Sequence, residues 1–321
     1  MLQSFISELS GSIAAVSGIL FAFSVTVVAT ALLAHLLPKD GGREFAHDGK
    51  LSAGKPRGAG IIFVLTFAVA ALLFIPLHAE MVIYLILIVI CMMTGYLDDA
   101  SKKSWGEYKK GFLDLCVAAM AALTYLKYNP STVDLAFLGI TLSLPAWLFA
   151  ICTVILIWTS VNVTNCADGV DGLSGTLGAI TILTIYILDL IRGRDESFTL
   201  LNLLFVACIL GYLWFNATPS VLMMGDAGSR AMGFFISLAI LKTGAPVLYI
   251  PVALVLILDG GLGLIKVTLI RFFKIHIMKN IRTPLHDQVR KVWNWSNTQT
   301  VYRFAIIQII LSVMTIYGIV L

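Results

Sequence analysis

The chain has 321 residues, of which 59% are hydrophobic and only 12% are charged, whereas about 25% are charged in an average soluble protein. This composition excludes a soluble globular protein, and a net charge of +4 is too small to indicate a nucleic-acid partner. Because a membrane-spanning helix takes about 20 apolar residues, the length leaves room for about ten such helices and short loops. We therefore expect residues 1–321 to form a single transmembrane domain.

Ten apolar segments predict an all-α, polytopic integral membrane protein with about ten transmembrane helices. They are residues 14–37, 59–77, 81–97, 111–126, 146–161, 173–191, 199–215, 231–241, 246–270 and 301–321. The ninth segment is long enough to tilt, to break or to leave the membrane. Between the fourth and fifth segments, the short apolar stretch 133–145 contains Gly139 and predicts a small β-hairpin.

The loops between these segments predict the orientation of the chain. The odd-numbered loops hold sixteen Lys and Arg residues and the even-numbered loops hold four. Because the side richer in Lys and Arg is cytoplasmic, we expect the odd-numbered loops in the cytoplasm and both termini on the extracytoplasmic side. The acidic motifs described next all lie in odd-numbered loops, so this orientation gathers them on the cytoplasmic face.

The first motif, GYLDDASKK, places Asp98 and Asp99 directly after the third segment. The pair is either a hydrated helix end beside lysines or part of a site for a divalent metal and phosphate. The second reading rests on the chemistry of Mg²⁺, which prefers carboxylate oxygens and combines few protein ligands with substrate phosphates.

The second motif, NVTNCADGVDGLSG, leads from the fifth segment into the sixth and contains Asn165, Asp168, Gly169 and Asp171. Glycines allow a ligand to approach the backbone closely, and the N-terminus of a helix attracts phosphate. Glycines for tight helix packing are the alternative. Packing explains neither the aspartates nor the asparagines, so the motif favours a phosphate-binding loop.

The third motif, MMGDAGSR, places Asp226 between glycines just before the eighth segment. Taken alone, Asp226 is equally well explained as a helix cap. However, three separate loops on one face each contribute carboxylates, and these repel one another unless a cation draws them together. A shared metal ion is therefore predicted.

The ninth loop and the ninth segment contain two further polar candidates. His286 is either a solvated loop residue or a contact to a diphosphate, because many cations lie in the same loop. Asp259 lies inside the apolar ninth segment, where a carboxylate costs about 2.5–3.5 kcal/mol. It is therefore either part of a functional site or the cap of a broken helix.

The order of these motifs resembles that of a known family. GKPRGAG at 54–60 is followed by LDDASK, NCADGVDGLSG, WFNATPSVLMMGDAGS, TPLH and WSNTQTVYRFAIIQ. In this order the chain resembles the polyprenyl-phosphate N-acetylhexosamine-1-phosphate transferases, and among them the phospho-N-acetylmuramoyl-pentapeptide transferases of bacterial peptidoglycan synthesis. The resemblance covers most of the chain.

The resemblance implies an activity, a location and partners. The reaction would transfer phospho-MurNAc-pentapeptide from UDP-MurNAc-pentapeptide to undecaprenyl phosphate, giving lipid I and UMP, with Mg²⁺ as cofactor. It would take place at the cytoplasmic face of the bacterial plasma membrane, in a homodimer surrounded by membrane lipid.

The resemblance also implies roles for individual residues. Asp98, Asp99 and Asp226 would be the catalytic carboxylates, with Asp226 and Asp99 at the metal. Contacts to the nucleotide and the rest of the substrate are implied for Lys55, Lys102, Asn165, Asp168, Gly169, Asp171, Asn216, Met223 and His286.

Two departures from the family pattern stand out. The family has three consecutive histidines where this chain has His286, Asp287 and Gln288, which puts in doubt any role of the two later positions at a diphosphate. Met223 replaces an aromatic residue that can stack on uracil. A thioether contributes about 0.3–1.5 kcal/mol against a ring, so we expect weaker stacking of the nucleobase.

The acceptor phosphate has its second pKa near 6, so it is largely a dianion at neutral pH and hardly needs a strong base. We therefore expect Asp98 to orient the acceptor or the water shell of the metal. A covalent intermediate on an aspartate remains open. The alternatives are a sister transferase that uses UDP-GlcNAc, which TPLH and the C-terminal motif disfavour, and an ion-coupled transporter, which would release no UMP.

Overall fold

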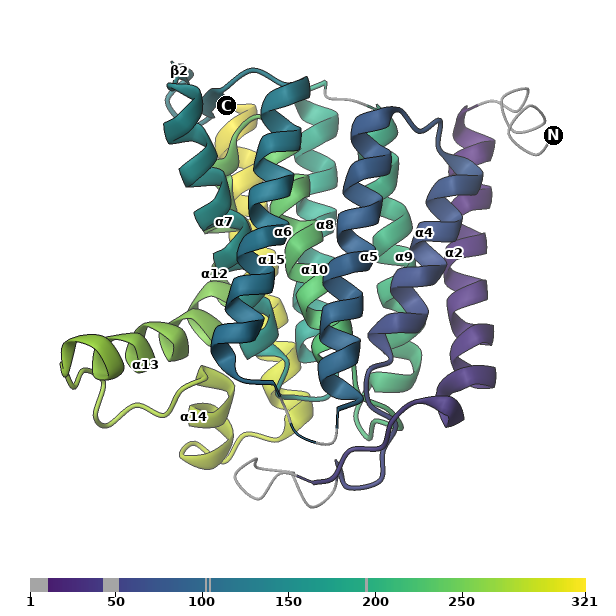
Figure 1. Ribbon diagram of the computed structural model, residues 1–321, viewed down its shortest axis with the longest axis vertical. Helices are drawn as coiled ribbons and strands as arrows, with labels where there is room; N and C mark the ends of the chain where they lie inside the picture. Colours follow the sequence, from purple (N-terminus) through teal and green to yellow (C-terminus); the bar gives the residue numbers. More distant parts are fainter. Residues whose placement is uncertain (1–10, 43–51, 102, 104, 194–195) are drawn as a thin grey trace.

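A computed structural model describes residues 11–42, 52–101, 103, 105–193 and 196–321 as a helical bundle with one small sheet (Figure 1). Before the sheet lie α2 (Gly11–Leu33), η1 (Ala34–Leu36), α4 (Gly60–Phe74), α5 (Ala79–Asp99) and α6 (Glu107–Tyr128). The sheet is formed by β1 (Thr132–Leu135) and β2 (Ile140–Ser143). The later elements are α7 (Ala146–Ala167), α8 (Leu173–Ile191), α9 (Glu196–Asn216), α10 (Gly225–Lys242), η2 (Pro246–Leu248), α11 (Tyr249–Val252), α12 (Leu254–Leu256), η3 (Ile257–Gly261), α13 (Leu262–Phe273), α14 (Leu285–Lys291) and α15 (Asn297–Val320).

All ten predicted apolar segments contain helix, which confirms the helical class of the prediction. In the described part of the chain, seven helices are long and apolar enough to cross a membrane, and a bent pair raises this number to eight. The shorter helix α4 and the central helix α10 are not among them. The count of about ten spans therefore stays a prediction.

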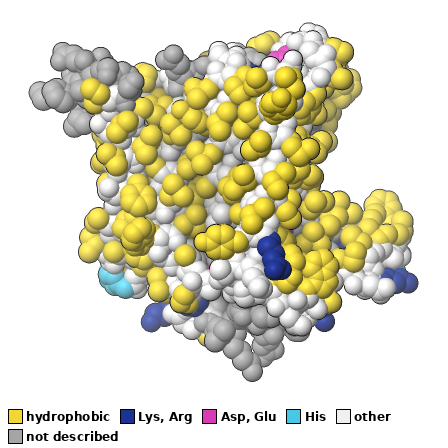
Figure 2. All heavy atoms as spheres, turned by 180° about the vertical axis from the view of Figure 1, so that it is seen from behind, with side chains coloured by type: hydrophobic (Ala, Val, Ile, Leu, Met, Phe, Trp, Pro, Cys, Tyr) yellow, Lys and Arg dark blue, Asp and Glu magenta, His cyan; other side chains and the backbone are white. Residues whose placement is uncertain are grey.

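Helix α10 occupies the centre of the bundle (Figure 1). Its residues from Gly225 to Leu241 are all buried, and it packs against α4, α5, α7 and α8. The outer helices instead point large apolar side chains outward, such as Leu123 and Ile155, and hydrophobic side chains cover much of the face seen in Figure 2. An apolar exterior of this kind is suited to contact with lipid.

The ninth predicted segment is broken, as its length allowed. Its parts Pro246–Val252 and Leu254–Phe273 meet at an angle of 72°, and α13 projects from the side of the bundle (Figure 1). Pro251 lies just before the break and cannot donate a backbone hydrogen bond. Gln308 of α15 satisfies the backbone there, because its amide donates to the Val252 carbonyl at 2.8 Å and accepts from the Val255 N–H at 3.1 Å.

The predicted hairpin is present as the antiparallel pair β1 and β2, with Thr132 opposite Ser143. The hairpin is fastened to the bundle, because the Asp134 N–H donates to the Gly244 carbonyl and its carboxylate pairs with Arg192. The C-terminal end of α15 lies at the same end of the bundle, and α14 lies near the opposite end (Figure 1).

Candidate active site

Three aspartates from two helices meet at one end of the bundle. Asp98 and Asp99 are the last residues of α5, and Asp226 is the second residue of α10. Gly225 makes this approach possible, because its φ is 72° and a Cβ there would lie 2.2 Å from Asp99 Oδ2. The Ala227 N–H then donates to the same oxygen at 3.2 Å.

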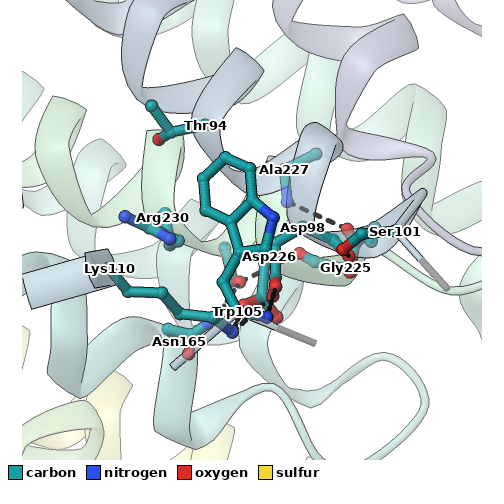
Figure 3. A network of polar contacts seen from close by, with 12 residues as sticks. Thr94, Asp98, Ser101, Trp105, Lys110, Asn165, Gly225, Asp226, Ala227 and Arg230 are labelled. Atoms are coloured by element: carbon teal, nitrogen blue, oxygen red, sulfur yellow. Dashed lines mark hydrogen bonds and ion pairs between the residues drawn. The ribbon is translucent and has the colours of Figure 1, made fainter. Parts of the chain in front are cut away.

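Two cations lie among these carboxylates. Lys110 of α6 donates to Asp226 Oδ2 at 2.9 Å and also pairs with Asp98, so that groups from three helices converge (Figure 3). Arg57, in the loop before α4, places Nε 2.8 Å from Asp99 Oδ1 and Nη2 3.5 Å from Asp226 Oδ1. Asp226 therefore shares one cation with Asp98 and another with Asp99.

The sequence did not predict that either cation belongs to the site. Lys110 contributed only to the choice of membrane side, and Arg57 was only part of a quoted motif. One feature of the sequence could have indicated Lys110 as a site residue: it lies in the same short loop region as Asp98 and Asp99. Burial lowers the pKa of Arg57, but the negative charges of Asp99, Asp226 and Asp40 outweigh it and raise the pKa above its usual value.

The carboxylates do not form a closed metal cage. Across the described residues, no group of three or more His, Cys, Asp and Glu side chains is arranged to hold a metal ion. Mg²⁺, however, usually takes one or two carboxylates together with waters and substrate phosphates. Asp99 and Asp226 fit that requirement, because both already direct an oxygen at one shared cationic group, the Arg57 guanidinium. The metal itself stays a prediction.

The glycine-rich loop between α7 and α8 is tied to the helices around this site. The Asp168 carboxylate accepts a hydrogen bond of 2.6 Å from the Ser174 hydroxyl in the first turn of α8. The Asn165 amide donates to the Ser229 hydroxyl of α10 at 2.9 Å. The predicted phosphate-binding loop is thus connected to the helix that carries Asp226.

The other side of this loop faces two further predicted site residues. Lys55 Nζ lies 3.7 Å from Asp171 Oδ2. Asn216 is buried, and the two ends of its amide accept from the Gly172 N–H at 2.8 Å and donate to the Leu222 carbonyl at 2.9 Å. Asn216 therefore holds the backbone of the loops rather than presenting a free amide.

His286 is buried, with 4% of its surface exposed, so the reading as a solvated loop residue is wrong. Its ring and backbone both bond to Asp259, which is fully buried. Asp259 thus accepts from the first turn of α14 rather than capping the broken helix in which it lies.

Met223 is half-buried, and its N–H donates to the Pro56 carbonyl at 2.8 Å. Lys102 lies outside the described residues.

Asp287, which stands where the family has a second histidine, is engaged within its own short helix. Its carboxylate accepts from Lys291 Nζ at 2.7 Å and from Arg290 Nη2 at 3.2 Å. Burial raises the pKa of Asp287, but the hydrogen bond from Lys291 and the neighbouring positive charges outweigh burial, so the pKa is lowered overall.

Comparison with known proteins assigns the chain to a family. Residues 81–244 match the family model described as Glycosyl transferase family 4. A protein of Treponema pallidum (strain Nichols), named phospho-N-acetylmuramoyl-pentapeptide-transferase, is 38% identical over 297 residues, which cover 86% of this chain and 81% of the relative. A protein of the same name from Bartonella quintana (strain Toulouse) is 25% identical over 284 residues, which cover 82% of this chain and 79% of that relative. The chain therefore belongs to glycosyl transferase family 4, and within it to the phospho-N-acetylmuramoyl-pentapeptide transferases.

Proposed function

We propose that this chain transfers phospho-MurNAc-pentapeptide from UDP-MurNAc-pentapeptide to undecaprenyl phosphate and releases UMP. The observation that carries the proposal is the cluster of Asp98, Asp99 and Asp226 with Lys110 and Arg57, beside a glycine-rich loop at one end of a bundle with an apolar exterior. Phosphoryl transfer is catalysed mainly by positioning and by neutralising charge. A cluster of carboxylates and cations can position the phosphates and neutralise their charge.

The proposal places the reaction on the cytoplasmic face of a bacterial plasma membrane. Support comes from the loops that carry the site, because the odd-numbered loops contain most of the Lys and Arg residues. In this orientation ten segments cross the membrane, and the β-hairpin and both termini lie outside the cytoplasm. We further propose that the enzyme is a homodimer, on the basis of the family resemblance.

We propose Asp99 and Asp226 as the ligands of a Mg²⁺ ion. When bound, the ion would polarise the donor diphosphate as a Lewis acid. Arg57 and Lys110, which contact these two carboxylates here, would then neutralise phosphate oxygens. Asp98, which accepts a hydrogen bond from the Trp105 N–H at 2.6 Å, would orient the acceptor phosphate.

The nucleotide would lie over the loop between α7 and α8. Asp168, Gly169 and Asp171 lie in this loop, Asn165 lies in the last turn of α7, and Lys55 lies at the other side of the loop. Met223 would contact the base through its thioether, and Lys102 would face a phosphate. Asn216 would act on the nucleotide indirectly, by holding the loop backbone.

The test is a transfer assay with purified protein, Mg²⁺ and a polyprenyl phosphate. UMP release is measured with UDP-MurNAc-pentapeptide and, in parallel, with UDP-GlcNAc. We expect release with the muramoyl donor only, and its loss in Asp226→Asn. Asp134→Asn, in the hairpin at the far end of the bundle, is the matched control and should retain activity. Release with UDP-GlcNAc alone would indicate the sister transferase, and no release with either donor would refute a transferase of this class.

A further inference from the structure

Asp259 is a buried carboxylate to which the proposed function assigns no role. Asp259 lies in the π-helical turn η3 of the broken segment, and none of its surface is exposed. An ionisable residue inside a membrane protein is costly and usually marks a functional site with a specific partner. The described part of the structure shows that partner.

The partner of Asp259 is His286, which lies 27 residues further along the chain. Asp259 Oδ1 accepts the His286 backbone N–H at 2.7 Å, and Oδ2 lies 2.8 Å from the ring nitrogen Nδ1. Two contacts from one carboxylate fix both the place of the residue and the plane of its ring. Because Nδ1 bonds to a carboxylate, it carries the proton in the neutral ring.

The opposite ring nitrogen, Nε2, faces the proposed phosphate-binding loop. A Cβ built on Gly169 would lie 2.3 Å from Nε2 and 2.7 Å from Cε1, so the ring packs directly on this glycine. Arg290 fastens the two parts together, because it donates to the Gly169 carbonyl at 3.3 Å and to the His286 carbonyl at 3.4 Å. Among the described residues, the hydrogen bond of the His286 ring is made through Nδ1, to Asp259.

We propose that Asp259 is a positioning residue for the transfer reaction. It holds His286 with Nδ1 inward, so that Nε2 is presented to the substrate over the Asp168–Gly169 turn. In the neutral ring Nε2 offers a lone pair, and in the protonated ring it donates a hydrogen bond to an anionic oxygen of the donor diphosphate. This inference rests on the proposed function for its substrate, whereas the ring orientation stands on the contacts alone.

The kinetic test compares Asp259→Asn with a matched control. Loss of a group that orients a metal-ligating histidine typically costs roughly 10- to 100-fold, and we expect a fall of similar size in kcat/KM for the UDP-linked donor. The KM for polyprenyl phosphate should be unchanged. The control is Asp189→Asn, a buried carboxylate of α8 that pairs with Asn202 at 2.9 Å, and it should behave like the wild type. Equal losses in both variants, or none in Asp259→Asn, would overturn the proposal.

A spectroscopic test does not depend on activity. The ¹⁵N shifts of a histidine-labelled sample, with His286→Gln to assign the signal, report which ring nitrogen carries the proton. We expect the Nδ1–H form at high pH in the wild type and its loss in Asp259→Asn. An Nε2–H form in the wild type would overturn the positioning role even in an active enzyme. Absence of UMP release with an Nδ1–H ring would instead overturn the proposed function.

A second variant guards against misfolding of Asp259→Asn. Gly169→Ala leaves Asp259 intact but adds a methyl group where Nε2 lies, and it should displace the ring. We expect it to lower kcat/KM for the donor, because the displaced ring no longer presents Nε2 at this turn. Full activity in Gly169→Ala would contradict the presentation of Nε2 at this turn.

Discussion

The buried ion pair between Asp114 of α6 and Arg230 of α10 leads to a prediction about stability. The side chains are 3% and 2% exposed. Among the described residues, Nε and Nη1 of Arg230 have no hydrogen-bond partner. Removing one partner of such a pair costs about 3–5 kcal/mol, because the other charge stays buried, whereas replacing both partners by apolar groups is neutral or stabilising by about 1–4 kcal/mol.

The variants Asp114→Leu, Arg230→Met and the double variant test this reasoning. The free energy of unfolding is measured by SDS titration in mixed micelles, with tryptophan fluorescence as the signal. Each single variant should lose about 3–5 kcal/mol, and the double variant should match or exceed the wild type. The exposed pair of Glu107 and Arg271, 2.6 Å apart, is the control, and breaking it should cost at most about 1 kcal/mol. If the double variant loses the sum of the two single losses, the pair is not coupled and the reasoning fails.

Three further predictions concern other parts of the molecule. Met223→Phe should tighten UMP binding in calorimetry by about 0.5–1.5 kcal/mol through stacking on the base, and weaker binding would contradict the proposed base contact. The lowered pKa of Asp287 means that its bond to Lys291 stabilises the fold above the unfolded pKa near 3.9 and is lost at lower pH. The melting temperature of Asp287→Asn should therefore lie below that of the wild type at pH 7, and the two should converge on acidification. Lys242 donates to buried Glu80 at 3.1 Å at the far end of the bundle, so Lys242→Met should lower the melting temperature and leave kcat unchanged, and a loss of kcat alone would refute this separation.

The helices and the hairpin could be predicted from the sequence, because each depends on a local pattern of residues. Each predicted apolar segment contains a helix, and the hairpin forms around Gly139 as expected. The three acidic motifs also lie together, because each directly follows or precedes a helix that ends on the same face. Periodicity and loop charge were enough for these features, since both are properties of short stretches of chain.

The remaining features depend on packing between distant segments. Lys110 lies 116 residues from Asp226, and nothing in either local stretch indicates that the two side chains meet. The burial of His286 depends on a carboxylate in another helix, and the break near Val252 is completed by Gln308 of α15. A single sequence contains no signal for such pairs, although a carboxylate in an apolar run, as at Asp259, does indicate that a partner exists.

The central position of α10 has a consequence for biogenesis. This helix carries Asp226, Arg230 and Lys242 within 18 residues, so it is a poor substrate for insertion into lipid by itself. Its charges are matched by groups on helices synthesised earlier, such as Asp114 and Glu80. The nascent chain must therefore hold those earlier helices in place while α10 leaves the translocon, and the order of synthesis becomes part of how the catalytic end is assembled.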